Sequence, residues 1–355
     1  MIVTPEAILE HVRSHIPGFV AVSNPVPLKG GLLNYVWRVP GQAQNIVVKY
    51  APPYIATLPD VSLDPVRIVF EARSLAAFSP GGPLAALTHL AARPPLLLDF
   101  DAKKDIIIQE DVGNYPDLGQ WLQHETLRAQ HGVYLGELIG QFIGALHRQT
   151  YLDGTFQQNF NNITIQESRL RGQYARIKDY LKRGHVPDAE ELGLRALELG
   201  QQLLKPGLCL TMGDLWPLSL LVTEDGLRII DWEFAHFGRP AQDVGHLAAH
   251  LWMHRHRASS PQGAILSQTV LNSFFQSYRQ NLGDKFEALF GVDGMRESAI
   301  HFGAEVLART VGTYQPGYLY DNLLPRSPAV QEAVQAAAAH IRLPETTATF
   351  AALAQ

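Results

Sequence analysis

The spacing of apolar residues changes near residue 115, and this change limits the folds that the chain can adopt. Before it, short runs of branched and aromatic residues alternate with turn residues, which is typical of β-strands. After it, long segments repeat apolar residues with the period of an α-helix. We find no internal repeats. The pattern predicts an α+β fold, with a small antiparallel β part followed by a larger helical part.

The N-terminal part is expected to contain two β-hairpins. Thr4 followed by Pro5 is typical of the start of a helix, whose apolar face would carry Ile8 and Val12. A second segment with the apolar spacing of a helix lies between the two hairpins. The expected elements are strands at residues 32–39, 45–50, 95–100 and 105–109 and a helix at residues 65–78.

The helical part is interrupted once by a β signal. Two apolar runs flank Thr223–Gly226, a turn whose glycine permits positive φ. The expected elements are helices at residues 134–148, 190–204 and 330–341 and a hairpin with strands at 218–222 and 227–230. We therefore predict a β-rich lobe at residues 1–111, a hinge at about 109–115 and a helical lobe at residues 116–355.

Charge and cysteine content exclude several classes of protein. The chain has 355 residues, enough for two lobes, and 29 basic against 34 acidic residues give it a net charge of −5. That balance provides no basic surface for a nucleic acid. The lone Cys209 excludes an intramolecular disulfide and a cysteine zinc site, and is expected to be a buried apolar residue. Without a signal peptide or an apolar run of about 18 residues, we expect a cytoplasmic protein that does not enter a membrane.

Two features of the β part are typical of phosphate binding. Gly30 and Gly31 lie in a turn between strand-like runs, where backbone can approach phosphates closely, although an ordinary hairpin has the same glycines. Lys49 lies in the apolar strand and can pair with Glu71 on the following helix. The alternative is that both charged groups face solvent.

Two acidic motifs follow in the helical part. Asp214, in the loop Met212–Ser219, fits a base that orients a hydroxyl, or else a turn or N-cap aspartate. Asp231 and Glu233 end an apolar strand and can face one cation if the chain stays extended there. A solvated turn is the alternative, which Trp232 argues against.

Together, a glycine turn, a strand lysine, a helix glutamate, a loop aspartate and Asp-x-Glu form the set used for phosphoryl transfer in a kinase fold. With these motifs the chain resembles the aminoglycoside phosphotransferase/choline kinase group of small-molecule kinases over nearly its whole length. The runs GGLLNYVWRV (30–39) and VKYAPPY (48–54) are similar to 5-methylthioribose kinases, and MGDLW (212–216) and DWE (231–233) also to fungal hydroxytryptamine kinases. The resemblance implies a bilobal protein-kinase-like fold.

The resemblance also implies roles for individual residues. Asp214 would be the catalytic base, Lys49 the phosphate-binding lysine and Glu71 its partner, while Asp243 would brace the catalytic loop. ATP would contact Gly30, Gly31, Asn34 and the hinge residues Gln109, Glu110, Asp111 and Val112. Mg²⁺ would be held by Ser219, Asp231 and Glu233. Two departures are Met212, where the wider family usually has histidine, and Ser219, where it usually has asparagine.

The expected activity is an ATP- and Mg²⁺-dependent transfer of the γ-phosphoryl group to a hydroxyl of a small metabolite. The sequence leaves the acceptor open among methylthioribose, an indole alcohol, an aminoglycoside and a choline-like amine, and leaves the oligomeric state open. A kinase-fold enzyme with other chemistry and a silent ligand-binding protein are the alternatives. Candidate acceptor residues are Trp216, Glu233, Arg239, Asn161 and Asn162, with Arg309, Tyr314 and Tyr318 as further lining residues. The clustered histidines 236, 246, 250, 254 and 256 are expected to be core or lining residues rather than metal ligands.

Overall fold

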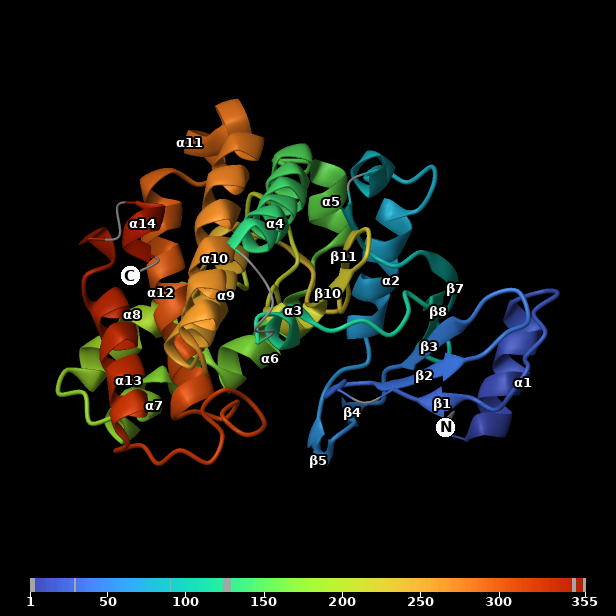
Figure 1. Cartoon of the computed structure of the whole chain (residues 1–355), viewed down its shortest axis with the longest axis horizontal. Helices are drawn as coiled ribbons and strands as arrows, with labels where there is room; N and C mark the ends of the chain where they lie inside the picture. Colours follow the sequence, from blue (N-terminus) through green and yellow to red (C-terminus); the bar gives the residue numbers. More distant parts are fainter. Residues whose placement is uncertain (1–3, 29, 90, 124–128, 347–348, 354–355) are drawn as a thin grey trace.

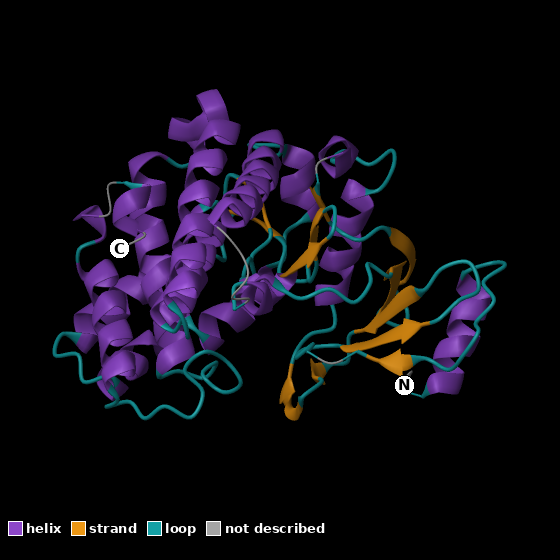
Figure 2. Ribbon diagram, viewed as in Figure 1, coloured by secondary structure: helices purple, strands orange, loops and turns teal. Residues whose placement is uncertain are grey.

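The chain folds into a small sheet-containing lobe and a large helical lobe, as the sequence predicts (Figures 1 and 2). The structure is a computed structural model, which describes residues 4–28, 30–89, 91–123, 129–346 and 349–353. Among the helices of these segments, none is both long enough and apolar enough to cross a membrane.

The small lobe is built on a five-stranded sheet in which neighbouring strands are antiparallel. Its order is β1 (Val26–Pro27), β2 (Tyr35–Val39), β3 (Ile46–Tyr50), β8 (Ile106–Glu110) and β7 (Leu97–Asp101). Both predicted hairpins are confirmed as β2–β3 and β7–β8. The observed strands begin one to three residues later than the apolar runs do.

Successive side chains of these strands point to opposite faces of the sheet, and the two faces pack against different helices. One face packs against α1 (Pro5–His15), where Ile8 and Val12 meet Trp37, Val48 and Ile108 in a separate apolar cluster. Thr4 caps α1 as predicted, since its hydroxyl accepts from Ala7 N at 3.3 Å. Lys49 follows Val48 in β3 and therefore lies on the opposite face, together with its cross-strand neighbour Ile107. That face is covered by α2 (Arg67–Phe78).

The remaining strands of the described residues form smaller sheets of two or three strands. The predicted hairpin is β10 (Leu220–Thr223) and β11 (Gly226–Ile229), and β6 (Ala92–Arg93) pairs with β11 in parallel. The sequence did not predict the ribbon of β4 (Tyr54–Ile55) and β5 (Leu58–Ser62), nor the pairing of β9 (Cys209–Thr211) with β12 (His236–Gly238). β4, β9 and β12 have only two or three residues, and β5 is exposed along its whole length, so none of them carries the apolar pattern of a buried strand.

The large lobe packs helices around one extended apolar core. Its long helices are α4 (Ala129–Gln149), α8 (Ala189–Gln202), α9 (Ala241–His256), α10 (Pro261–Leu282), α12 (Gly291–Thr310) and α13 (Pro328–Arg342). Shorter ones are α3 (Leu118–Trp121), α5 (Gly154–Asn159), α6 (Ile163–Gly172), α7 (Ile177–Arg183), α11 (Phe286–Leu289) and α14 (Phe350–Leu353). α4, α8 and α13 correspond to the three helices predicted for this lobe, although α8 ends two residues before the predicted residue 204.

Candidate active site

Lys49 lies at the centre of a buried ion-pair cluster between the lobes. Its Nζ is 2.8 Å from Glu71 Oε2 on α2 and 2.7 Å from Asp231 Oδ1, which follows β11. Burial alone would lower the pKa of Lys49, but Asp231 and Glu71 outweigh it and raise the pKa, so the amine stays charged. The Asp231 side chain is 42% exposed, which leaves it accessible to a ligand. The predicted Lys49–Glu71 pair is thus present, and the alternative of solvated charges is not.

Glu233 is held by two side chains of the small lobe. Asn34, in the loop after the glycine turn, donates Nδ2 to Glu233 Oε2 at 2.7 Å, and Arg67 Nε lies 3.4 Å from the same oxygen. Burial raises the pKa of Glu233, while Lys49 and Arg67 oppose that change. The contact therefore ties the glycine-turn segment to the Asp-x-Glu segment.

Arg67 belongs to the candidate site, although the sequence marks it only as a charge close to Glu71. It is fully buried at the start of α2. Its guanidinium also donates to backbone carbonyls of three segments around it, those of Leu33, Pro52 and the pair Leu63 and Asp64. The only signal in the sequence is the apolar helix around it, which does not distinguish a buried arginine from an exposed one.

The backbone at Asp231 differs from the extended chain that the sequence reading assumed. Asp231 has a φ of +63°, an uncommon conformation for a residue other than glycine. Trp232 is buried and donates Nε1–H to Ile229 O at 2.8 Å. The strand therefore turns sharply at Asp231, and Glu233 reaches the Lys49 cluster by way of this turn.

The loop that carries Asp214 is braced from α9. Asp243 Oδ2 and Oδ1 accept from the backbone N–H groups of Met212 and Gly213, each at 2.8 Å, and His147 Nε2 lies 3.2 Å from Asp243 Oδ2. The bracing role implied for Asp243 is therefore present. Gly213 has a φ of +78°, and a Cβ there would lie 2.3 Å from Phe234 O, so the turn before Asp214 requires glycine.

Ser219 joins the Asp214 loop to the Asp231 segment. Its carbonyl accepts from Ile230 N at 2.9 Å, beside Asp231. Its hydroxyl donates to Trp216 O at 2.8 Å and is fully buried. The geometry gives Ser219 a role in the loop itself, while its predicted role as a metal ligand stays a prediction.

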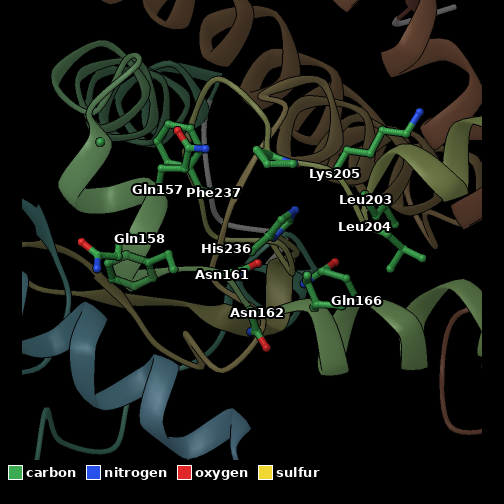
Figure 3. A pocket seen from close by; sticks show the side chains of 14 residues that line it. Gln157, Gln158, Asn161, Asn162, Gln166, Leu203, Leu204, Lys205, His236 and Phe237 are labelled. Carbon is green, nitrogen blue, oxygen red and sulfur yellow. The ribbon is translucent and has the colours of Figure 1, made fainter.

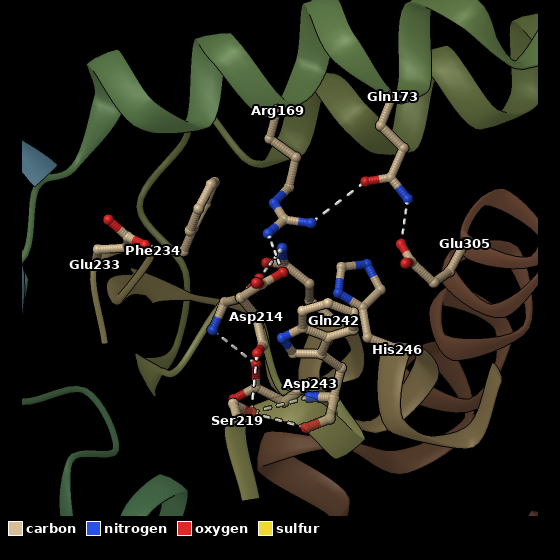
Figure 4. A network of polar contacts seen from close by, with 12 residues as sticks. Arg169, Gln173, Asp214, Ser219, Glu233, Phe234, Gln242, Asp243, His246 and Glu305 are labelled. Carbon is tan, nitrogen blue, oxygen red and sulfur yellow. Dashed lines mark hydrogen bonds and ion pairs between the residues drawn. The ribbon is translucent and has the colours of Figure 1, made fainter. Parts of the chain in front are cut away.

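Asp214 is paired with an arginine that the sequence reading missed. Arg169 on α6 donates Nη2 to Asp214 Oδ1 at 2.7 Å, and its guanidinium stacks over the Phe234 ring at 4.5 Å (Figure 4). Burial would lower the pKa of Arg169, but the Asp214 carboxylate raises it. Arg169 also donates Nη1 to Gln173 Oε1, and Gln173 Nε2 donates in turn to Glu305 Oε2 on α12. No sequence motif indicates this contact, which depends on how α6 crosses the loop.

A second arginine contacts the same Glu305 carboxylate and lies among aromatic rings. Arg309 on α12 donates Nε to Glu305 Oε1 at 2.8 Å. Its guanidinium carbon lies 4.5 Å from the Trp216 ring centre, 5.3 Å from that of Tyr318 and 5.4 Å from that of Tyr314. The structure therefore gathers Trp216 and the three predicted lining residues Arg309, Tyr314 and Tyr318 into one group. Predicted Arg239 is placed elsewhere, where its Nε donates to Glu297 at 2.6 Å.

Asn161 and Asn162 line a cavity of about 440 Å³ together with His236 and Phe237, which follow the Asp-x-Glu segment in the chain (Figure 3). Asn162 Nδ2 donates to the carbonyls of Glu233 and Ala235, at 3.2 and 3.0 Å, and thereby supports this segment from behind. Asn161 is exposed at the cavity edge. The cavity shares no lining residue with the Lys49 cluster.

The predicted hinge residues lie at the end of β8 and directly after it: Gln109 and Glu110 are its last residues, and Asp111 and Val112 follow. The acidic ones are neutralised, because Glu110 accepts two hydrogen bonds of 2.7 Å from Arg93 and Asp111 accepts bonds of 2.6 and 2.9 Å from Arg38. Burial would raise the pKa of Glu110, but the bonds from Arg93 lower it. Gln109 is buried, and Oε1 of its side chain accepts no hydrogen bond from the described residues.

Comparison with known proteins finds relatives that are named as kinases. A 4-hydroxytryptamine kinase of Psilocybe cyanescens is 22% identical over 79% of this chain and 80% of its own length. A methylthioribose kinase of Geobacillus sp. (strain WCH70) is 23% identical over 79% and 76%, respectively.

Solved structures share the fold at low sequence identity. The streptomycin–ATP–APH(2″)-IIa ternary complex has a TM-score of 0.51 and 15% identity, covering 94% of this chain and 97% of that one. Choline kinase from Cryptosporidium parvum Iowa II has a TM-score of 0.52 and 12% identity, covering 96% and 95%. The model of the phosphotransferase enzyme family (APH) matches residues 26–269, more than half of the chain. The chain therefore belongs to the phosphotransferase enzyme family.

Proposed function

We propose that this member of the family is an ATP- and Mg²⁺-dependent kinase that phosphorylates a hydroxyl group of a small metabolite. The observation that carries the proposal is the joined geometry of two loops. The Asp231 segment forms the buried cluster with Lys49 and Glu71, and Ser219 connects it to the loop of Asp214. Such an arrangement can hold phosphates and an acceptor hydroxyl side by side. An ATP-dependent reaction on a metabolite also fits the expected cytoplasmic location.

The donor groups at this site fit a magnesium nucleotide. Asp231 and Glu233 offer carboxylate oxygens, the ligands that Mg²⁺ prefers, and Lys49 offers a fixed ammonium group for phosphate oxygens. Mg²⁺, when bound, would neutralise charge on the phosphates. Gly30, with a φ of +108°, and Gly31 would let backbone approach the phosphates. Residues 109–115 are proposed as the hinge between lobe 1–111 and lobe 116–355, where the backbone would meet adenine.

Asp214 is proposed to orient the acceptor hydroxyl. Because Arg169 occupies Asp214 Oδ1, the other carboxylate oxygen is the one available to accept the hydroxyl proton. Arg169 keeps the carboxylate in one orientation, and Asp243 fixes the backbone of its loop. The contribution of these residues is positioning, which supplies most of the rate when the transition state is loose.

The two arginines beside the Asp214 loop favour a polyhydroxylated or anionic acceptor over an amine. Arg169 contacts Asp214, and Arg309 packs on Trp216 of the same loop, while their acidic partners Asp214 and Glu305 are already paired. A cationic amine would meet two guanidinium groups, whereas sugar oxygens can accept from them. Of the compounds left open by the sequence, a methylthioribose-like sugar fits this lining better than hydroxytryptamine-like or choline-like amines.

A panel of acceptors tests the proposal. Wild-type protein with Mg-ATP would be given methylthioribose, 4-hydroxytryptamine, choline and an aminoglycoside, while ADP is measured and the phosphate ester is detected by ³¹P NMR. We expect acceptor-dependent ADP release, with the sugar ahead of the amines. ADP release that no acceptor accelerates would point to other chemistry. Absence of Mg-ATP binding would point to a silent binding protein.

A further inference from the structure

Two histidines and two aspartates converge at the outer edge of the small lobe, far from the Lys49 cluster in the fold. His11 and His15 are one turn apart on α1, and Asp99 and Asp101 are alternate residues of β7. One ligand atom from each of His11, His15 and Asp99 lies within 4.8 Å of the other two. His15 Nε2 is also 3.5 Å from Asp101 Oδ2, and His11 Nδ1 is 4.0 Å from it. Asp99 and Asp101 face the same side as their cross-strand partners Ile108 and Ile106, which belong to the apolar cluster with α1.

The hydrogen bonds of His15 determine which of its nitrogens has a free lone pair. His15 Nδ1 is 2.9 Å from the carbonyl oxygen of His11. A carbonyl can only accept, so Nδ1 carries the proton and Nε2 of the neutral ring is a lone-pair donor. Such a bond from the other ring nitrogen to a backbone carbonyl is the usual support of a metal-bound histidine.

His11 and Asp99 present buried polar atoms that the protein leaves unpaired. His11 is 3% exposed, and neither of its ring nitrogens has a hydrogen-bond partner among the described residues. Asp99 Oδ2 is likewise buried without a donor in the described part of the chain. Buried polar atoms are nearly always paired in native proteins, so two such side chains facing each other require an explanation.

We propose that His11, His15, Asp99 and Asp101 bind one divalent transition-metal ion, with Zn²⁺ as the best match. Neutral imidazole nitrogens and carboxylate oxygens are zinc ligands, and four protein ligands make a closed tetrahedral site of the structural type. Mg²⁺ fits poorly, because it prefers oxygen ligands and retains waters. The site is therefore distinct in chemistry from the carboxylates proposed for Mg-ATP.

The metal would fasten α1 to the edge strand of the sheet. α1 is otherwise held by the apolar contacts of Ile8 and Val12 with the sheet. His15 and Asp101 are 27% and 12% exposed, which gives an ion a path from solvent. The expected effect of binding is a higher melting temperature of the protein.

Binding is tested with protein that lacks a histidine tag and has been stripped with a chelator. Zn²⁺ is titrated by calorimetry, and Co²⁺ is used as a spectroscopic probe because its visible absorption reports tetrahedral geometry. We expect one equivalent of Zn²⁺ per chain and a tetrahedral Co²⁺ spectrum. His15→Gln should weaken Zn²⁺ binding by more than about 100-fold, beyond the effect of an outer-shell change. Asp99→Asn should act in the same direction.

His89→Gln is the matched control, because His89 is an exposed histidine of the small lobe away from this cluster. It should bind Zn²⁺ as the wild type does. Equal Zn²⁺ affinity in wild type and His15→Gln would overturn the proposal, as would a purely octahedral Co²⁺ spectrum. His15 is partly exposed, so its variant remains informative if Asp99→Asn does not fold. None of these readouts depends on kinase activity.

Discussion

Arg169 is the residue whose importance emerges only from the folded chain. Its guanidinium pairs with Asp214, stacks on Phe234 next to Glu233 and reaches Glu305 through Gln173. It therefore contacts both loops proposed to act on the substrate. A residue in this place controls how Asp214 is oriented more than whether ATP is bound.

Replacing Arg169 with methionine should therefore separate turnover from nucleotide binding. We expect Arg169→Met to lower kcat by about 10- to 100-fold, the range for a misplaced catalytic group, and to leave the KM for ATP within about twofold. Arg171→Met, on the exposed face of the same helix, should leave both constants unchanged. Steady-state kinetics at saturating acceptor measures the two effects. An Arg169→Met enzyme with normal kcat would show that the ion pair does not position Asp214.

At the scale of elements, the packing of α4 on α10 depends on a glycine stripe. Gly136, Gly140 and Gly144 lie four residues apart on α4 and face α10. A Cβ on Gly140 would lie 2.5 Å from Phe274 O, and one on Gly136 would lie 2.4 Å from Val270 O. The two helix backbones therefore approach more closely than any side chain at these positions would permit. His147, in the last turn of α4, contacts Asp243, so this packing also supports the loop of Asp214.

Gly140→Ala should force the two helices apart. We expect the free energy of unfolding to fall by about 1–3 kcal/mol, the usual cost of overpacking. Gly154→Ala is the control, because a Cβ at Gly154 meets no atom within 4 Å and its φ is not positive. It should leave stability unchanged or raise it by up to about 1 kcal/mol. Urea unfolding measures both variants, and equal stabilities would contradict the close approach.

The long elements were predictable from the sequence because their apolar periodicity extends over several turns or strand residues. α4, α8, α13 and both hairpins of the small lobe match their predicted positions to within a few residues. The β9–β12 pair was not predictable, since three-residue strands carry no period and their paired residues lie 25 to 29 positions apart. Helix periodicity likewise indicates that α4 is amphipathic but not that its glycines set the distance to α10.

At the scale of the whole molecule, the large lobe buries several neutral histidines. Burial lowers the pKa of His236 to about 4 and the pKa values of His246 and His254 to about 3. His246 contacts Tyr174, and His254 contacts Tyr318. These partners agree with the expectation of core or lining residues. In the unfolded chain the same side chains take up protons near pH 6.5.

Stability should consequently fall when the pH drops below about 6.5. Between that pH and the lower pKa of the folded state, the unfolded chain binds more protons, so acid favours unfolding. Each of these histidines should lower the free energy of unfolding by about 1.4 kcal/mol between roughly pH 7.5 and 5.5. Urea unfolding at the two pH values measures the change. His254→Gln should reduce the drop, His89→Gln should not, and a stability independent of pH would contradict neutral burial.

The candidate site was predictable only in part. The motifs indicated Lys49, Glu71, Asp214, Asp231 and Glu233, because each belongs to a short run with a recognisable neighbourhood. The motifs did not indicate Arg67 or Arg169, because a buried arginine and an exposed one look alike in a helical sequence. Arg239 was expected among the acceptor residues, but its partner Glu297 lies on α12.

The central claim is that Asp214 acts on an acceptor hydroxyl in a kinase reaction. Asp214→Asn keeps the size of the side chain and removes the base. With the acceptor found in the panel, we expect kcat to fall by at least about 100-fold, at the lower end of what a general base contributes. Calorimetry should show wild-type affinity for Mg-ATP. Asp179→Asn, at an exposed position on α7, should behave as wild type does. Full turnover in Asp214→Asn would contradict the account.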